Sequence, residues 1–147
     1  MSRDGIRVWG RKTSSNVQAL MWGLAELGLE VAERVDIGHR FGGTDTPEFR
    51  AMNPNGTVPV LQDGDLVIFE TGAILRYLAG QYGRAPFWPD DPRERALVDM
   101  WAEWAKLNVA LAFTAPVFWQ VTRVPPSQRD PARLRQGLEA LAPKLTI

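Results

Sequence analysis

Three short polar segments of the sequence, 11–16, 53–59 and 70–71, hold side chains able to bind or activate a small ligand. The first segment ends in Ser14, Ser15 and Asn16, directly before an apolar helical pattern. Hydroxyls at such a position either cap the helix or donate a hydrogen bond to an anion near its positive end. Any Ser-Ser-Asn run before a helix gives the same signal, so this segment taken alone favours capping.

The second segment contains the pair Val58-Pro59 at the start of an expected strand. Proline suits that place only where a cis bond or an edge position makes it useful. A cis bond would turn the N–H and C=O of Val58 outward, where they could pair with an extended peptide through main-chain hydrogen bonds. The alternative interpretation is an ordinary turn proline.

The third segment is Glu70-Thr71, at the start of a further helical pattern. The carboxylate can accept from an ammonium group, and the hydroxyl lies beside the free N–H groups of a helix N-terminus. Together they would form a receptor for the zwitterionic head of an amino acid. The alternative is an acidic residue that favours the start of a helix.

Secondary structure must bring these segments together, and hydrophobic periodicity predicts the order β-α-β-α-β-β-α. Strands are expected at 6–9, 29–37, 58–62 and 66–69, with an Asp-Gly turn joining the last two. Helices are expected to begin after an N-cap at Ser15 or Asn16, at Pro47, and after a cap at Thr71. In this order, all three polar segments fall at the ends of strands or the starts of helices.

A second, all-helical region is predicted after a proline-rich stretch at 85–92. A long helical pattern covers 93–115, and Pro116 predicts a kink at its end. Asp130-Pro131 then predicts the start of another helix.

Composition excludes several classes of function. The 147 residues include 17 Lys and Arg against 17 Asp and Glu, so no net field favours nucleic acid or an anionic membrane surface. Without cysteine and with a single histidine, a disulfide framework, a Cys/His zinc site and a dithiol redox centre are not expected, and we predict no metal.

No apolar run approaches the roughly 20 residues of a membrane span, so we expect a cytoplasmic protein. The histidine, His39, lacks a recognisable Ser/Asp arrangement and is interpreted as a loop residue.

Three motifs carry a resemblance to the cytosolic glutathione transferase family: TSSNVQ at 13–18, NPNGTVPVL at 53–61 and FETGAILRYL at 69–78. Their order and spacing are similar to those of bacterial members with a serine-type site. The resemblance implies a thioredoxin-like, glutathione-binding α/β domain at 1–84, a linker at 85–92 and an all-helical C-terminal domain at 93–147. Because family members continue through several more helices, the C-terminal domain is expected to be incomplete.

The resemblance also implies which groups contact the glutathione sulfur. A hydroxyl at the start of the first helix would hydrogen-bond the sulfur and favour its thiolate, with Ser14 the first choice and Ser15 the second. Asn16 could also donate a hydrogen bond. Donors and a helix N-terminus lower the pKa of a thiol because they stabilise its anion.

The remaining contacts follow from the same resemblance. Val58, before a cis Pro59, would pair with the cysteinyl backbone of glutathione, and Glu70 and Thr71 would hold its γ-glutamyl ammonium and carboxylate.

One position departs from the family pattern. Relatives often carry a basic residue at position 57, where this chain has Thr57. The contact to the glycine carboxylate would then pass to His39 or Arg40.

The function implied is transfer of the glutathione thiolate to a hydrophobic, electrophilic small molecule by a homodimeric detoxification enzyme. The absence of cysteine argues against a mixed-disulfide mechanism. The alternative is a degenerate or truncated glutathione-binding or interaction module without transferase activity.

Overall fold

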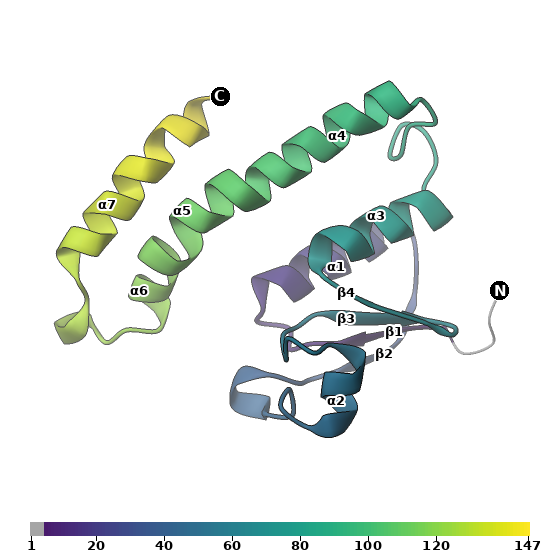
Figure 1. Cartoon of the computed structure of the whole chain (residues 1–147), viewed down its shortest axis with the longest axis horizontal. Coiled ribbons are helices and arrows are strands. Elements are labelled where there is room, and N and C mark those ends of the chain that lie inside the picture. The colour runs from purple at the N-terminus through teal and green to yellow at the C-terminus, as the bar shows by residue number, and fades with distance from the viewer. Residues whose placement is uncertain (1–4) are drawn as a thin grey trace. The chain divides into compact units, whose positions relative to one another are not determined.

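A computed structural model describes residues 5–147 of the chain (Figure 1). The chain forms two compact units, one ending at Asp90 and the other running from Asp91 to Ile147. Within the described residues, no helix is both long enough and apolar enough to cross a membrane.

The first unit is built on a mixed sheet of four strands in the order β2-β1-β3-β4. Its elements are β1 (Ile6–Trp9), α1 (Ser15–Glu26), β2 (Val31–Val35), α2 (Pro47–Met52), β3 (Val60–Asp63), β4 (Leu66–Phe69) and α3 (Thr71–Tyr82). Strand β1 runs parallel to β2 and antiparallel to β3, and β3 and β4 form an antiparallel hairpin. The predicted element order and thioredoxin-like fold class are therefore confirmed.

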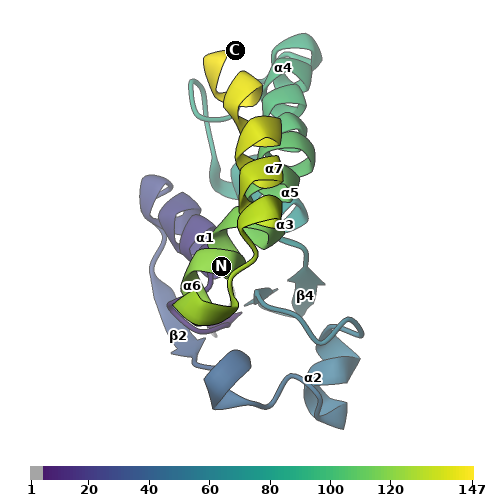
Figure 2. The ribbon, with the colours of Figure 1, turned by 90° about the vertical axis from the view of Figure 1, so that its left-hand side faces the viewer.

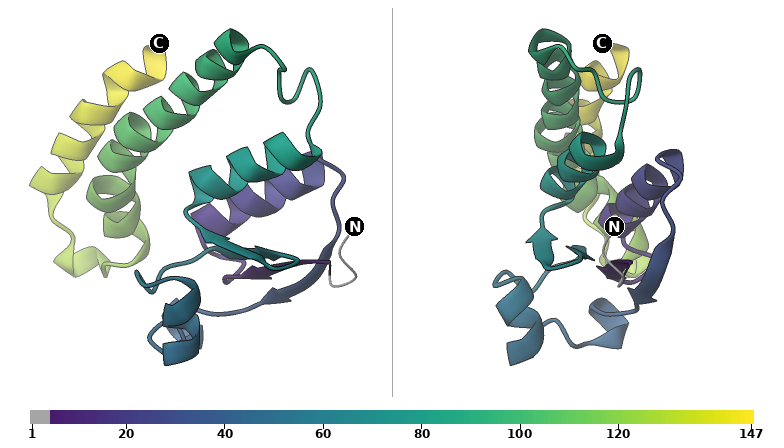
Figure 3. Two further views of the ribbon diagram at one scale, coloured as in Figure 1. Left: turned by 45° about the vertical axis from the view of Figure 1, so that its right-hand side comes forward. Right: turned by 90° about the vertical axis from the view of Figure 1, so that its right-hand side faces the viewer.

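Helices α1 and α3 lie side by side on one face of the sheet, and α2 lies on the other side (Figure 3). Strand β1 alternates buried and half-buried positions, so its side chains at Ile6 and Val8 face the core while the intervening ones do not. The core cluster joins the sheet to both helices and consists of Ile6, Val8, Leu20, Leu24, Leu61, Ile74 and Leu78. This packing holds the N-terminal ends of α1 and α3 close to each other. Each of these ends carries one of the predicted polar segments.

The structure corrects several predicted boundaries. Helix α1 is capped by Ser14, not by Ser15 or Asn16, and α3 by Glu70, not by Thr71. Strand β2 is shorter than the predicted 29–37 because the N–H of Leu29 donates to the carbonyl of Leu24, closing the end of α1 instead of joining the sheet. Strand β3 begins at Val60, not at residue 58.

The second unit contains α4 (Pro92–Trp104), α5 (Leu111–Phe113), α6 (Trp119–Thr122) and α7 (Pro131–Leu141). Wider π-helical turns at Ala105–Ala110 and Thr114–Phe118 join the first three into one helical path, along which α7 packs (Figure 2). Pro116 was expected to end this path with a kink but lies inside the second π-helical segment. A wider turn accommodates a proline ring that an ideal α-helix would reject. The predicted start of α7 is confirmed, since the Asp130 carboxylate accepts from the N–H groups of the first turn.

Candidate functional site

The first unit carries a polar pocket of about 230 Å³ into which all three predicted segments project. It is lined by Asn16, Thr57, Val58, Pro59, Glu70 and Thr71. Asn16 belongs to the first turn of α1, and Thr71 is the first residue of α3. Two helix N-termini therefore contribute residues to one small cavity, which favours an anionic ligand because free N–H groups and the helix dipoles concentrate there.

Ser14 lies at the N-cap of α1 with its residue only 8% exposed. Its hydroxyl does not cap the helix and has no hydrogen-bond partner within residues 5–147. In that same range no buried side-chain oxygen or nitrogen lacks a partner, so the hydroxyl must reach the accessible surface. The side-chain capping interpretation of this serine is wrong, and its donor is available to another molecule.

The other polar residues of this segment differ in placement. Ser15 is exposed as the first residue of α1. Neither Ser14 nor Ser15 is among the pocket-lining residues, whereas Asn16 is. The structure thus puts Ser14 and Asn16 in distinct settings: Ser14 is a nearly buried residue whose hydroxyl has no partner, and Asn16 is an exposed residue that lines the pocket.

The bond between Val58 and Pro59 is cis. Among residues 5–147, no backbone group hydrogen-bonds to the N–H or C=O of Val58, although the next strand begins only two residues later. The main-chain groups of Val58 are therefore available on the pocket wall for pairing with an extended ligand.

The loop before Val58 is held by Asn53, a polar residue that is 1% exposed. Its Nδ2 donates to the carbonyl oxygen of Thr57 at 2.8 Å and to the Thr57 hydroxyl at 3.2 Å. Its Oδ1 accepts from the N–H of Asn55 at 3.0 Å. Gly56 adopts φ 63°, a left-handed conformation that glycine takes at little cost, and completes the tight turn. The position of Val58 is thus fixed by a partly buried hydrogen-bond network centred on Asn53.

Glu70 adopts φ 71°, a conformation rarely populated by residues other than glycine. It is the N-cap of α3, and its carbonyl oxygen accepts the N–H of Ile74 at 2.9 Å. Non-glycine residues held in such conformations cluster at ligand-binding and catalytic sites. Glu70 is exposed and lines the pocket directly before the first residue of α3.

His39 and Arg40 lie in a single 3₁₀ turn, His39–Phe41, and both are exposed. Neither is among the residues that line the pocket. The structure therefore does not bring these two predicted site residues together with the other candidates.

Sequence reasoning did not assign Thr57 to the site as a contact, and it left Arg11 without a role. Thr57 lines the pocket. A Cβ on Gly38 would lie 3.4 Å from the Nη1 of Arg11 and 3.5 Å from the Cγ1 of Val58. The guanidinium of Arg11 is thus close to the Val58 side of the site, a proximity that depends on the loop at Gly38 and has no signature in local sequence.

The assembled groups fit one class of ligand. An exposed carboxylate suits an ammonium, helix N-termini suit carboxylates or a thiolate, and the unpaired edge at Val58 suits a peptide backbone. In the described part of the chain, no group of three or more His, Asp or Glu side chains is arranged to hold a metal ion.

Comparisons with known proteins show which family the chain belongs to. Residues 5–80 match the family model described as glutathione S-transferase, N-terminal domain. The chain is 40% identical over 131 residues to glutathione S-transferase GstB of Escherichia coli, covering 88% of this chain and 62% of that protein. It is 41% identical over 99 residues to glutathione S-transferase F14 of Arabidopsis thaliana, covering 65% of this chain and 36% of the plant protein.

A solved structure shows the same fold with a ligand. The theta class glutathione S-transferase of Xanthomonas axonopodis pv. citri, crystallised with glutathione bound, superposes with a TM-score of 0.89 at 45% identity, covering 97% of this chain and 67% of that one. The chain spans less than two thirds of the length of the curated relatives it matches. With a family model over more than half of its residues and the matching fold, the chain belongs to the glutathione S-transferase family.

Proposed function

We propose that the chain binds reduced glutathione in the pocket between the N-termini of α1 and α3. Glu70 accepts from the γ-glutamyl ammonium, and Thr71 with the first N–H groups of α3 holds the adjacent carboxylate. The main chain of Val58, before the cis Pro59, pairs with the cysteinyl backbone. The glycine carboxylate lies toward the Val58 side of the site and is held by Arg11, whose guanidinium is close to that side, or by His39 or Arg40, which are not among the pocket-lining residues.

The observation that carries the proposal is the Ser14 hydroxyl, which is at a helix N-terminus and has no hydrogen-bond partner within residues 5–147. We propose that it donates to the glutathione sulfur. Ser15 is the second choice, and Asn16, on the pocket wall, supplies a further donor. A hydrogen bond and the positive end of α1 stabilise the thiolate, so more of the bound thiol is ionised at neutral pH.

The reaction is a nucleophilic substitution or addition. The glutathione S–H loses its proton to solvent, and the sulfur's electron pair forms a C–S bond with an electrophilic carbon. In a substitution the carbon–halogen bond breaks and the halide leaves with its bonding electrons; in an addition the π bond of the electrophile breaks and the resulting anion takes a proton from solvent. The role of Ser14 is electrostatic: it stabilises the sulfur anion and is not itself consumed.

The finer parts of the proposal follow the family. We propose a hydrophobic, electrophilic small molecule as second substrate, a role in detoxification, a cytoplasmic location and a homodimer. The proposed organisation is a glutathione-binding domain at 1–84, a linker at 85–92 and a helical domain at 93–147.

The experiment compares turnover of a chlorodinitrobenzene with reduced glutathione in the wild type and in the variants Ser14→Ala and Ser15→Ala. Glutathione affinity is measured in parallel by calorimetric titration. Loss of a thiolate-stabilising donor should lower kcat by about a hundredfold to a thousandfold in Ser14→Ala, with glutathione still bound. Equal activity in both variants would refute the serine mechanism and direct attention to Asn16 or Thr13. Binding without turnover in the wild type would favour a binding module.

A further inference from the structure

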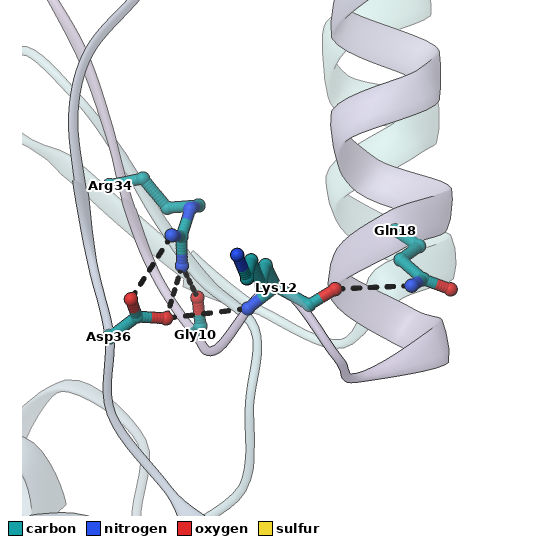
Figure 4. A network of polar contacts seen from close by, with 5 residues as sticks. All are labelled: Gly10, Lys12, Gln18, Arg34 and Asp36. Atoms are coloured by element: carbon teal, nitrogen blue, oxygen red, sulfur yellow. Dashed lines mark hydrogen bonds and ion pairs between the residues drawn. The ribbon is translucent and has the colours of Figure 1, made fainter. Parts of the chain in front are cut away.

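The turn that carries Ser14 is tied to the end of β2 by an ion pair (Figure 4). The Arg34 Nη1 donates to the carbonyl oxygen of Gly10 at 2.7 Å and to the Asp36 Oδ1 at 2.6 Å, and the Arg34 Nη2 donates to the Asp36 Oδ2 at 3.2 Å. The same Oδ1 accepts the N–H of Lys12 at 3.4 Å. The ion pair thus contacts the backbone on both sides of residue 11, and it adds to the main-chain bonds from the N–H of Gly10 to the carbonyl of Val35 at 2.9 Å and from the N–H of Arg11 to the carbonyl of Ile37 at 3.2 Å.

The turn is held from α1 as well. The Gln18 Nε2 donates to the carbonyl oxygen of Lys12 at 3.1 Å, as Figure 4 shows. The N–H of Ser14 donates to the carbonyl oxygen of Arg11 at 3.1 Å and closes the turn. The peptide group on each side of Lys12 is therefore anchored, one to β2 and the other to α1, immediately before Ser14.

The ion pair is partly shielded from solvent, with side chains 24% exposed for Arg34 and 36% for Asp36. The hydrogen bond from Arg34 lowers the pKa of the Asp36 carboxyl, so the carboxylate stays charged at neutral pH. Other cations near the turn are Arg11 and Lys12, both part of the turn itself. The planar guanidinium meets both oxygens of Asp36 with two nitrogens while one of them also bonds the carbonyl of Gly10, a fork geometry that a lysine ammonium does not reproduce.

We propose that Arg34, supported by Asp36, is a positioning residue for the thiolate: it fixes the turn at 11–14 and thereby the direction in which the Ser14 hydroxyl donates. This inference rests on the proposed function. Arg34 acts only through the backbone of the turn and does not touch glutathione. Because thiolate stabilisation depends on the direction of one donor, a displaced turn weakens it even when the fold is intact.

The chain offers a matched control in Arg7 and Glu33. This pair also joins an arginine to an acidic side chain across β1 and β2, with the Arg7 Nε donating to the Glu33 Oε2 at 2.9 Å. Its side chains are 43% and 48% exposed, and neither bonds the turn that carries Ser14. Arg7→Gln therefore breaks a comparable ion pair without releasing that turn.

The test is the pH profile of kcat at saturating glutathione, which reports groups that titrate in the complex. It is measured with reduced glutathione and a chlorodinitrobenzene for the wild type, Arg34→Gln, Arg34→Lys and Arg7→Gln, each checked by thermal melting. In Arg34→Gln the apparent thiol pKa should rise toward that of free glutathione, and kcat should fall by about tenfold to a hundredfold. The KM for glutathione should change little. Arg34→Lys should not restore the profile, and Arg7→Gln should match the wild type.

A lowered thiol pKa that persists in folded Arg34→Gln would overturn the inference and leave the proposed function standing. If Arg34→Gln does not melt cooperatively, the same pH profile is measured for Asp36→Asn. This variant removes the charge that orients Arg34 and keeps the size of the side chain at position 36. A wild-type complex in which the thiol titrates as in free glutathione would refute the proposed function, and the inference with it.

Discussion

The Nδ2 of Asn53 donates to the carbonyl oxygen of Thr57 at 2.8 Å, in a site where Asn53 is 1% exposed. This bond closes the loop one residue before Val58, the residue with unpaired main-chain groups on the pocket wall. A buried side-chain amide thus connects the interior of the first unit to the edge that we assign to the glutathione backbone.

Asn53→Ala should both destabilise the first unit and weaken glutathione binding. The carbonyl of Thr57 and the N–H of Asn55 would lose their partner, and a typical intramolecular hydrogen bond contributes about 0.5–1.5 kcal/mol. Denaturant unfolding and calorimetric titration measure the two effects. Asn55→Ala is the control, because it keeps the backbone N–H that Asn53 accepts. Equal glutathione affinity in the Asn53 variant and the wild type would show that the loop does not position Val58.

Glu70→Gln should raise the KM for glutathione much more than it lowers kcat. The change keeps the shape of the side chain and removes the charge assigned to the ligand's ammonium, and a hydrogen bond to a charged group contributes about 1.5–3 kcal/mol. The expected loss of affinity is therefore about tenfold to a hundredfold. Glu48→Gln, an exposed acidic residue in the first turn of α2, is the matched control. A change in kcat with KM unaltered would contradict the assignment of Glu70 to ligand binding.

Tyr77 and Tyr82 of α3 both donate to the same oxygen of Asp63, at 2.8 Å and 2.5 Å. Asp63 is the last residue of β3, so the pair fastens the β3–β4 hairpin to α3. Burial and then the hydrogen bond to Asp63 raise the pKa of Tyr77, whereas the hydrogen bond to Asp63 is the main cause that raises the pKa of Tyr82.

A raised folded-state pKa means that the folded protein holds these protons more tightly than the unfolded chain does. The stabilisation is complete below the unfolded pKa of about 10 and is lost as the pH rises through the folded values. The double variant Tyr77→Phe/Tyr82→Phe should be less stable than the wild type at neutral pH and should lose less stability above about pH 10. Denaturant midpoints across this pH range measure both. Parallel declines in the two proteins would show that the tyrosines do not cause the alkaline loss.

Alanine at Gly137 and at Gly80 should have opposite effects on stability. A Cβ at Gly137 in α7 would lie 2.7 Å from the Cβ of Pro116 and 2.8 Å from the Cγ2 of Val117, so overpacking should cost about 1–3 kcal/mol. At Gly80 in α3 the nearest atom is the Trp88 Nε1 at 3.9 Å, so the higher helix propensity of alanine should stabilise by about 0.5–1 kcal/mol. Thermal melts compare the two, and a stabilising Gly137→Ala would refute the close packing of α7 on Pro116.

Much of the fold could be predicted because it depends on local signals. Thr46 accepts from the N–H of Phe49 at the start of α2, and Asp130 caps α7, as a capping side chain followed by proline predicts. The misplaced start of β2 has a local cause: the N–H of Leu29 donates to the carbonyl of Leu24 and closes the preceding helix, which the apolar run at 29–37 does not reveal. The π-helical turns around Pro116 instead pack against α7, which is distant in sequence.

The candidate site was predicted in part for the same reason. Hydroxyls before a helix and a carboxylate before another are visible in sequence, and their segments meet in the pocket. The left-handed conformation of Glu70 and the buried role of Asn53 are not visible, because tertiary contacts impose them. The ion pair joins Arg34 to Asp36, which hydrophobic periodicity assigns to an ordinary strand end, so no local sequence signal predicted the pair.

The most direct test of the central claim is a thermal melt of the 147-residue chain with and without excess reduced glutathione. A ligand that binds only the folded state, at about 100 times its dissociation constant, adds about 2.7 kcal/mol to the free energy of unfolding. The proposed glutathione pocket predicts a cooperative transition that moves to higher temperature when glutathione is present. A cooperative transition at the same temperature with and without glutathione would contradict it.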